Sequence, residues 1–256
     1  MSDHILRGRT EEEVLWFRRR GFLQAAAAWT SMGGFAAAWA QQRSNVVDLQ
    51  GDAIVNGERL RPGAFIQSGD QLATGPNSTV VFVVGSSAFH VRQNSRLVVE
   101  RGATLNSISV LRMLTGAVVS VWGKGSSRQI TTPTLTAGIR GTGVYTEIFS
   151  AEAYRTYFCN CYGVVELASG GDRATSRADY HQSFWGEPQP KGGRLLTPAR
   201  AINHTDEEVE YVAKLVNQQP NWVAMGRRGE KDGRGYMEPQ PEYMHPVGPP
   251  APAPAR

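Results

Sequence analysis

Short β-branched runs, separated by Gly, Pro, Asn and Asp, follow one another from Val46 to about Leu167. Branched side chains pack well on a pleated surface, whereas the separating residues interrupt strands and form turns. The pair Asn56-Gly57 predicts a two-residue hairpin, because such turns require positive φ angles. This pattern restricts the chain to an all-β fold, either a short-stranded β-sandwich or a β-roll.

The runs differ in how their apolar residues are spaced. Thr79–Val84 is almost continuously apolar, as expected for a strand that is buried on both faces. Ser95–Glu100 and Thr115–Trp122 partly alternate, which predicts half-exposed strands. The 28 Gly residues and 14 Pro residues suit one turn-rich domain better than two independent cores.

Helical periodicity begins only at Thr205. Thr205 and Glu208 form a capping-box pattern, and an apolar face follows at Val209, Val212, Ala213 and Val216. We expect one C-terminal helix that packs on the β-body and ends at Pro220. The acidic residues 206–208 complement the helix dipole in its first turn, so their presence requires no catalytic role.

The N-terminal segment carries features of export. The sequence RRRGFLQ resembles the twin-arginine signal, with Arg19 and Arg20 as the arginine pair, and an uncharged run extends from Gly21 to Ala40. The small residues at Ala38 and Ala40 suit signal peptidase cleavage. We therefore expect a periplasmic protein. The alternative is that the run stays uncleaved as a membrane anchor, which its length permits.

These patterns divide the chain into four regions. Residues 1–40 form the twin-arginine signal peptide, residues 46–190 the β-domain, and residues 191–222 a connecting segment with the C-terminal helix. Residues 223–256 form a flexible tail rich in Pro and Gly, because this composition buries too little apolar surface to offset the entropy of ordering. The net charge of +4 is too small to indicate a nucleic-acid partner.

Two stretches of the β-domain carry a family resemblance. The Gly63–Thr74 stretch, which ends in GDQLAT, and the TPTLTAGIRGT run from Thr132 to Thr142 resemble the FecR protein domain. The resemblance implies a periplasmic sensing or binding module in envelope signalling, with no catalytic residues and no cofactor general to the family. The partner of such a module would be an envelope protein. Alternatively, the chain itself is a cell-wall-associated structural protein that contacts peptidoglycan or another polysaccharide.

The Gly138, Gly141 and Gly143 cluster lies within this run. Its spacing is wrong for a nucleotide loop, and no Lys-Ser pair or helix follows it. We interpret these residues as structural glycines at turns. Arg140 between them is expected to bond neighbouring carbonyls or to face an anionic ligand.

The two cysteines, Cys159 and Cys161, lie one residue apart in a predicted strand, so both thiols face the same side. Three interpretations stay open. They form a disulfide or redox pair, or they bind a metal ion together with His181 and His204, or they are small buried apolar side chains. Because a twin-arginine substrate crosses the membrane folded, a cofactor can be acquired before export.

A catalytic function has little support in the sequence. Cys159 or Cys161 with His181 would make a Cys-His nucleophile, but the sequence identifies neither an orienting third group nor an oxyanion site. We therefore expect a non-enzymatic protein.

Four aromatic residues are candidates for a platform on which a carbohydrate stacks, with core packing as the alternative. They are Trp122, Tyr180, Phe184 and Trp185.

Overall fold

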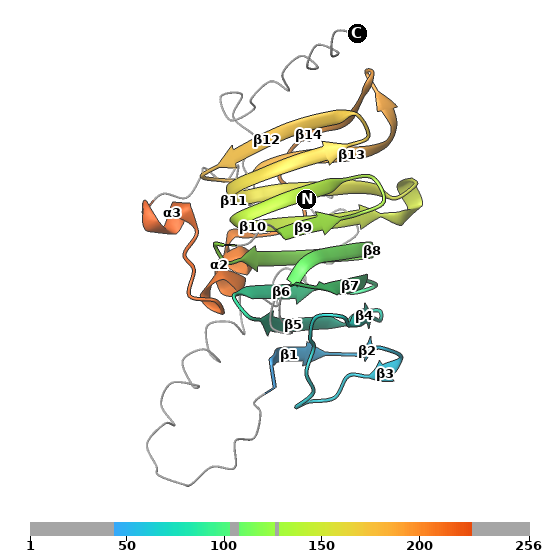
Figure 1. The fold of residues 1–256 in the computed structure, drawn as a ribbon, viewed down its shortest axis with the longest axis vertical. Coiled ribbons are helices and arrows are strands. Elements are labelled where there is room, and N and C mark those ends of the chain that lie inside the picture. The colour runs from blue at the N-terminus through green and yellow to red at the C-terminus, as the bar shows by residue number, and fades with distance from the viewer. Residues whose placement is uncertain (1–43, 103–107, 126–127, 227–256) are drawn as a thin grey trace, which may run out of the picture.

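The computed structural model describes residues 44–102, 108–125 and 128–226 (Figure 1). The predicted signal segment, with Arg19 and Arg20, and residues 227–256 of the predicted tail lie outside the described residues. Within them, one hydrogen-bonded sheet contains fourteen strands, stacked along the long axis of the molecule, with the two helices on one side of the stack. The predicted all-β class is confirmed.

The strands of the sheet are antiparallel to their neighbours except for the parallel pair β8–β9. Their bounds are β1 Val46–Gln50, β2 Ala53–Val55, β3 Glu58–Arg59, β4 Gln71–Thr74, β5 Thr79–Val84, β6 Ser87–Val91, β7 Arg96–Arg101, β8 Ile108–Trp122, β9 Arg128–Thr131, β10 Thr136–Phe149, β11 Arg155–Ser169, β12 Asp172–Ala178, β13 Gln182–Lys191 and β14 Arg194–Ala199. A short 3-10 turn at Ser150–Glu152 links β10 to β11, and the helices are α2 Asp206–Lys214 and α3 Asn221–Ala224.

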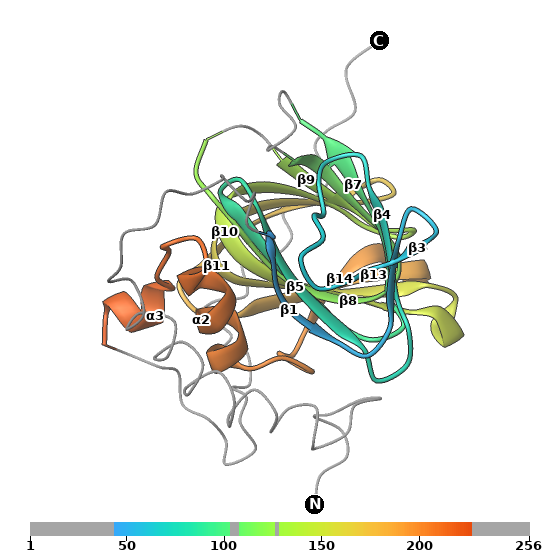
Figure 2. The same cartoon turned by 90° about the horizontal axis from the view of Figure 1, so that it is seen from below.

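Three strands are much longer than the others. β8, β10 and β11 have 15, 14 and 15 residues, and they pair with one another in the order β8, β10, β11 through the middle of the sheet. Viewed from below, the sheet curls around an interior, and α2 and α3 lie outside the curl (Figure 2). The long strands therefore present one face to the interior and the other to the helices.

The hairpin predicted at Asn56-Gly57 is confirmed. Val55 of β2 faces Glu58 of β3, so two residues form the turn. Asn56 has φ 52° and Gly57 has φ 88°, the positive values that this type of hairpin requires.

The apolar side chains form two separate clusters, one on each face of the long strands. Val118 and Trp122 belong to the interior cluster, whereas Val119 and Val121 belong to a cluster that also contains side chains of α2 and α3. The expectation that Thr115–Trp122 would be half exposed is therefore wrong for its second half, because the helices cover the outer face. The continuously apolar strand Thr79–Val84 is buried as predicted.

Helix α2 begins where the sequence predicted. Thr205 is its N-cap and accepts a hydrogen bond from the backbone N–H of Glu208, with 3.2 Å between the two heavy atoms. The helix ends at Lys214, six residues before the predicted end at Pro220. Asn217 adopts φ 53°, the left-handed conformation that commonly follows a helix and prevents its continuation.

No helix among the described residues is both long and apolar enough to cross a membrane.

Candidate metal centre

Four predicted donor residues converge between the sheet and the helical segment. Cys159 and Cys161 lie on β11, His181 lies in the bend between β12 and β13, and His204 lies between β14 and α2. One donor atom from each residue can be chosen so that all four lie within 4.8 Å of one another. The Cys-Cys-His-His set proposed from the sequence is therefore assembled in the folded chain.

The strand geometry of β11 places both thiols on the outer face. Because side chains alternate along a strand, Asn160 points the other way and bonds Thr142 and Ser176. Cys159 is flanked in the sheet by Tyr145 on β10 and by Ser183 on β13. Pairing on both sides holds the backbone at Cys159 and Asn160, whereas Cys161 lies at a register shift of the β10–β11 pair.

The two histidines come from constrained bends. His181 has φ 21°, an uncommon value for a residue with a side chain, and its backbone N–H donates to the Cys161 carbonyl at 3.1 Å. Asn203, just before His204, has φ 61°. The ring of His204 stacks on Tyr145, with ring centroids 4.6 Å apart. These bends direct both imidazoles at the thiols.

Four of the six donor separations lie within about 0.4 Å of the edges of a tetrahedral zinc site, and all six are within 4.8 Å. Cys159 Sγ lies 3.5 Å from His181 Nδ1, and Cys161 Sγ lies 3.6 Å from His204 Nε2. The two sulfurs are 3.9 Å apart and the two nitrogens are 3.0 Å apart. Tetrahedral zinc with ordinary bond lengths gives edges of about 3.8 Å for S–S, about 3.6 Å for S–N and about 3.4 Å for N–N.

The other nitrogen of each imidazole is held by an oxygen. His181 Nε2 lies 2.9 Å from Asp206 Oδ1, and His204 Nδ1 lies 2.7 Å from the Ile202 carbonyl oxygen. A histidine ligand commonly donates its second N–H to a carboxylate or carbonyl, which fixes the ring and the tautomer. Here this leaves Nδ1 of His181 and Nε2 of His204 as the nitrogens that face the sulfurs.

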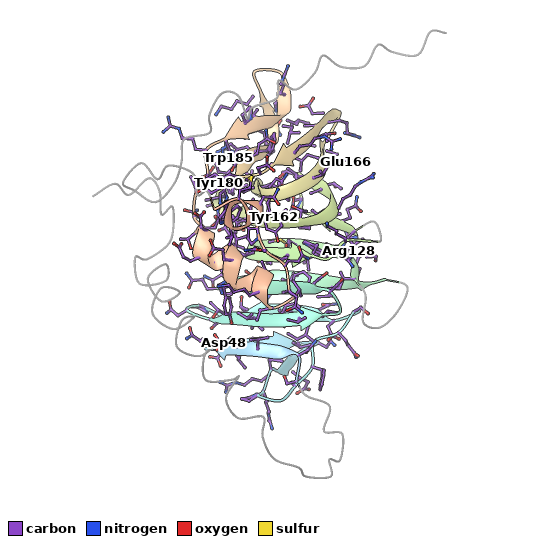
Figure 3. All side chains as sticks on the ribbon, turned by 90° about the vertical axis from the view of Figure 1, so that its left-hand side faces the viewer. Asp48, Arg128, Tyr162, Glu166, Tyr180 and Trp185 are labelled. Atoms are coloured by element: carbon purple, nitrogen blue, oxygen red, sulfur yellow. The ribbon has the colours of Figure 1, made fainter. Side chains whose placement is uncertain are left out.

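Aromatic rings enclose the cluster. The two cysteines and His204 are fully buried, and His181 is 9% exposed. Trp222 of α3 stacks on His181, with centroids 5.1 Å apart and an interplanar angle of 27°. Tyr180 donates from its hydroxyl to Asp206, and it lies with Trp185 and Tyr162 on the helix side of the molecule (Figure 3). This apolar surround excludes water from the donor atoms.

Burial and mutual contact shift the acidity of these groups. Burial raises the pKa of Cys161 well above its ordinary value, and the neighbouring Cys159 and Asp206 reinforce the effect. At Cys159, burial is outweighed by the hydrogen bond from Cys161 and by His204 and His181, which hold the pKa well below its ordinary value. Burial lowers the pKa of His181, but Cys159 and Asp206 raise it to about 9. A divalent cation would displace the remaining protons.

A site with four protein ligands is suited to a structural metal rather than to catalysis, since catalytic zinc sites keep a position open for water or substrate. Cys159, His181 and Asp206 also line up as a nucleophile, a base and an orienting acid. Cys159 has no exposed surface, however, so a substrate could reach it only if the helices moved. Both cysteines are free thiols in this structure.

Sequence reasoning missed the role of Asp206. Its position in the first turn of α2 was explained by the helix dipole alone, yet its carboxylate holds His181. Asp206 lies two residues after His204, but the histidine that it orients is His181, 25 positions earlier, so no local pattern indicated this contact. Glu208 was also assigned only to the cap and the helix dipole, whereas its carboxylate bonds His90 of β6 and Arg92, which directly follows that strand.

The aromatic platform is not assembled. Trp122 and Phe184 belong to the interior cluster and are 0% and 6% exposed. Trp185 lies against Arg155, whose guanidinium carbon is 3.8 Å from the ring centroid. Core packing and a cation–π contact therefore account for these rings.

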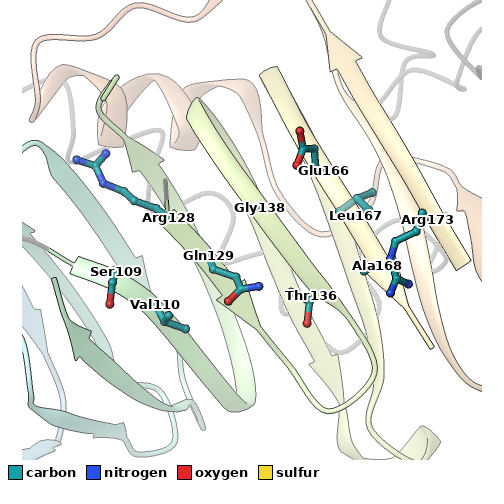
Figure 4. Close-up of a pocket in the computed structure, with 10 residues that line it drawn as sticks. All are labelled: Ser109, Val110, Arg128, Gln129, Thr136, Gly138, Glu166, Leu167, Ala168 and Arg173. Atoms are coloured by element: carbon teal, nitrogen blue, oxygen red, sulfur yellow. The ribbon is translucent and has the colours of Figure 1, made fainter. Parts of the chain in front are cut away.

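A shallow groove of about 480 Å³ crosses the sheet from β8 and β9 to β12 (Figure 4). Gly138 lies between Arg128 and Glu166 along it. The arginines at its edges are bonded within the chain: Arg128 donates to the Gly123 carbonyl and Arg173 to the Gly170 carbonyl. Arg140, expected to bond carbonyls or an anion, forms an exposed ion pair with Glu166 at 3.1 Å.

No family model matches the sequence, and no curated protein matches it. Two crystal structures of a candidate anti-sigma factor from Parabacteroides distasonis are coarsely similar to this chain. One has 6% sequence identity and a TM-score of 0.43 and covers 57% of this chain. The other has 8% identity and a TM-score of 0.44 over the same share. The chain spans 64% and 63% of those proteins, which is less than two thirds of their length.

Proposed function

We propose that this protein is a non-catalytic β-domain that binds one zinc ion through Cys159, Cys161, His181 and His204. The observation that carries the proposal is the spacing of the four donor atoms, which all lie within 4.8 Å and approximate a tetrahedron. A chance meeting of buried side chains would not need to satisfy this geometry.

Zinc is the metal that fits this donor set best. Two thiolates and two imidazoles in a tetrahedron are typical of zinc, whereas magnesium and calcium prefer six or more oxygen ligands. The dry aromatic surround favours a resident ion over one in exchange with water. The four donors would fill the coordination positions of a tetrahedral zinc ion, which supports a structural or sensing role over hydrolysis.

We further propose that the zinc domain is an exported, FecR-like sensing module in the cell envelope. The resemblance of RRRGFLQ to a twin-arginine signal and of the TPTLTAGIRGT run to the FecR domain supports this. Twin-arginine export moves folded proteins, which is compatible with metal loading before translocation. The partner would be an envelope protein, with peptidoglycan or another polysaccharide as the alternative.

Metal analysis of the purified chain tests the zinc assignment. We expect one zinc per chain by plasma mass spectrometry and two free thiols per chain in denaturant with chelator and no reductant. Cobalt(II) added to the apoprotein should give the visible absorption of a tetrahedral site with thiolate ligands.

The Cys161→Ser variant should lose the stoichiometric zinc. His90→Gln serves as the matched control, because His90 is buried beside α2 but contributes no donor. Protein that lacks metal as purified and takes up neither zinc nor cobalt after reduction would refute the proposal. A disulfide between Cys159 and Cys161 would instead support the redox pair.

Replacing both Arg19 and Arg20 by Lys should retain the protein in the cytoplasm, since the twin-arginine machinery reads this pair. Fractionation of cells that express the wild type and the Lys-Lys variant measures the change. Unchanged export of the variant would remove the twin-arginine assignment but would leave the zinc site untouched.

A further inference from the structure

We infer that zinc acts as a latch, which holds residues 200–224 on the outer face of the sheet and lets that segment detach when the ion leaves. The inference rests on the proposed zinc binding and adds a consequence for the fold. Loss of the ion would then expose the outer face of the sheet, which this segment covers when zinc is bound.

The first argument is the origin of the ligands. Cys159 and Cys161 belong to the sheet, whereas His204 belongs to the segment that leads into α2. Asp206, which orients His181, is the first residue of α2 itself. A metal ion at this point therefore joins the sheet to the helical segment directly through His204 and indirectly through Asp206.

The second argument is that the helical segment does not contribute to the interior core. Val209, Val212, Ala213 and Trp222 all belong to the outer cluster, and the interior cluster contains no residue of either helix. The β-body therefore keeps its own core when the helices leave. Local opening of such a unit is expected to cost less free energy than global unfolding.

The third argument is that the segment cannot keep its structure alone. Helix α2 has nine residues and α3 has four, and isolated helices shorter than about 12 residues are marginal in water. The outer cluster and the ion pair between Glu208 and Arg92 also hold α2. Zinc binding therefore adds to the contacts that hold α2 on the sheet and shifts the equilibrium toward the docked state.

Limited trypsin digestion of the full chain measures this equilibrium. Lys214 is exposed at the end of α2, but cleavage after it requires the helix to open. At a free zinc concentration of about 1,000 times the dissociation constant, cleavage there should slow by up to about 1,000-fold. Lys191, exposed at the end of β13 just before the turn to β14, is the internal control and should be cut at a zinc-independent rate.

Four results separate the possible outcomes. Zinc-dependent protection at Lys214 alone supports the latch, and His204→Ala should then be cut rapidly at every zinc concentration. Stoichiometric zinc with unchanged cleavage at Lys214 overturns the latch while the zinc assignment stands. Equal acceleration at Lys191 and Lys214 on zinc removal also overturns it, because the whole domain would then unfold together. Absence of zinc binding would defeat the proposed function itself.

Discussion

Cys161→Ser should lower the melting temperature of the zinc-loaded protein by about 8–16 °C. A ligand bound only by the folded state stabilises it by about 4 kcal/mol at 1,000 times its dissociation constant. A chain of this size melts about 2–4 °C lower for each kcal/mol that is lost. Serine nearly preserves the volume of the cysteine, so the loss should reflect the missing thiolate. Differential scanning calorimetry with and without excess chelator measures the melting temperatures of the metal-free and zinc-loaded proteins.

The effect should depend on zinc. In chelator, the wild type and Cys161→Ser should melt within a few degrees of each other, because neither holds the ion. With zinc present, the melting temperature of Asp206→Asn should lie between those of the wild type and Cys161→Ser. Loss of an orienting contact lowers metal affinity by about 10–100-fold. If Cys161→Ser lowered the melting temperature equally with and without zinc, the Cys161 thiol would contribute to stability through packing alone.

Glu208→Gln should destabilise the fold by about 3–5 kcal/mol, because it leaves a buried guanidinium without its counter-charge. Glu208 and Arg92 are 1% and 6% exposed, and Arg92 Nε donates to Glu208 Oε1 at 2.8 Å. His90 Nδ1 lies 2.9 Å from the same oxygen. Urea unfolding of the wild type and the variant at neutral pH measures the difference.

The double variant Arg92→Leu with Glu208→Leu is the matched control. Removing both charges leaves no unpaired ion, so the double variant should be less destabilised than Glu208→Gln. A decrease of less than about 1 kcal/mol in the free energy of unfolding for Glu208→Gln would contradict the prediction, because the pair would then stabilise the fold no more than a surface ion pair does.

The contribution of Glu208 should also depend on pH. Burial alone would raise the pKa of its carboxyl, but Arg92 and His90 outweigh burial and hold it well below its usual range. A depressed pKa in the folded state stabilises the protein fully above the unfolded value of about 4.3 and less at lower pH. The stability gap between the wild type and Glu208→Gln should therefore shrink as the pH falls below about 4.

Features that depend on near neighbours could be predicted from the sequence. The hairpin at Asn56-Gly57 follows from the positive φ angles of a two-residue turn, and Thr205 caps α2 through a bond to a residue three positions away. The two thiols share a face because strand side chains alternate. Each of these follows from short-range backbone geometry.

Exposure along Thr115–Trp122 could not be predicted in the same way. Alternation shows that a strand has two different faces, but not what covers each of them. Val119 and Val121 are buried because α2, more than eighty positions further along the chain, packs on the outer face. Gly116 and Ser120 interrupt the apolar run and made it resemble an alternating strand, although apolar clusters pack on both of its faces.

An all-β body, a capped C-terminal helix and a set of four candidate donors could be predicted from the sequence. Their meeting became evident only in the folded chain, because Cys161 and His204 are 43 positions apart in sequence while their sulfur and nitrogen atoms lie 3.6 Å apart. That distance depends on the register of β11 with β13 and on the docking of α2, which no local pattern encodes. The same packing brought Asp206 behind His181 and made the predicted residues a candidate zinc centre.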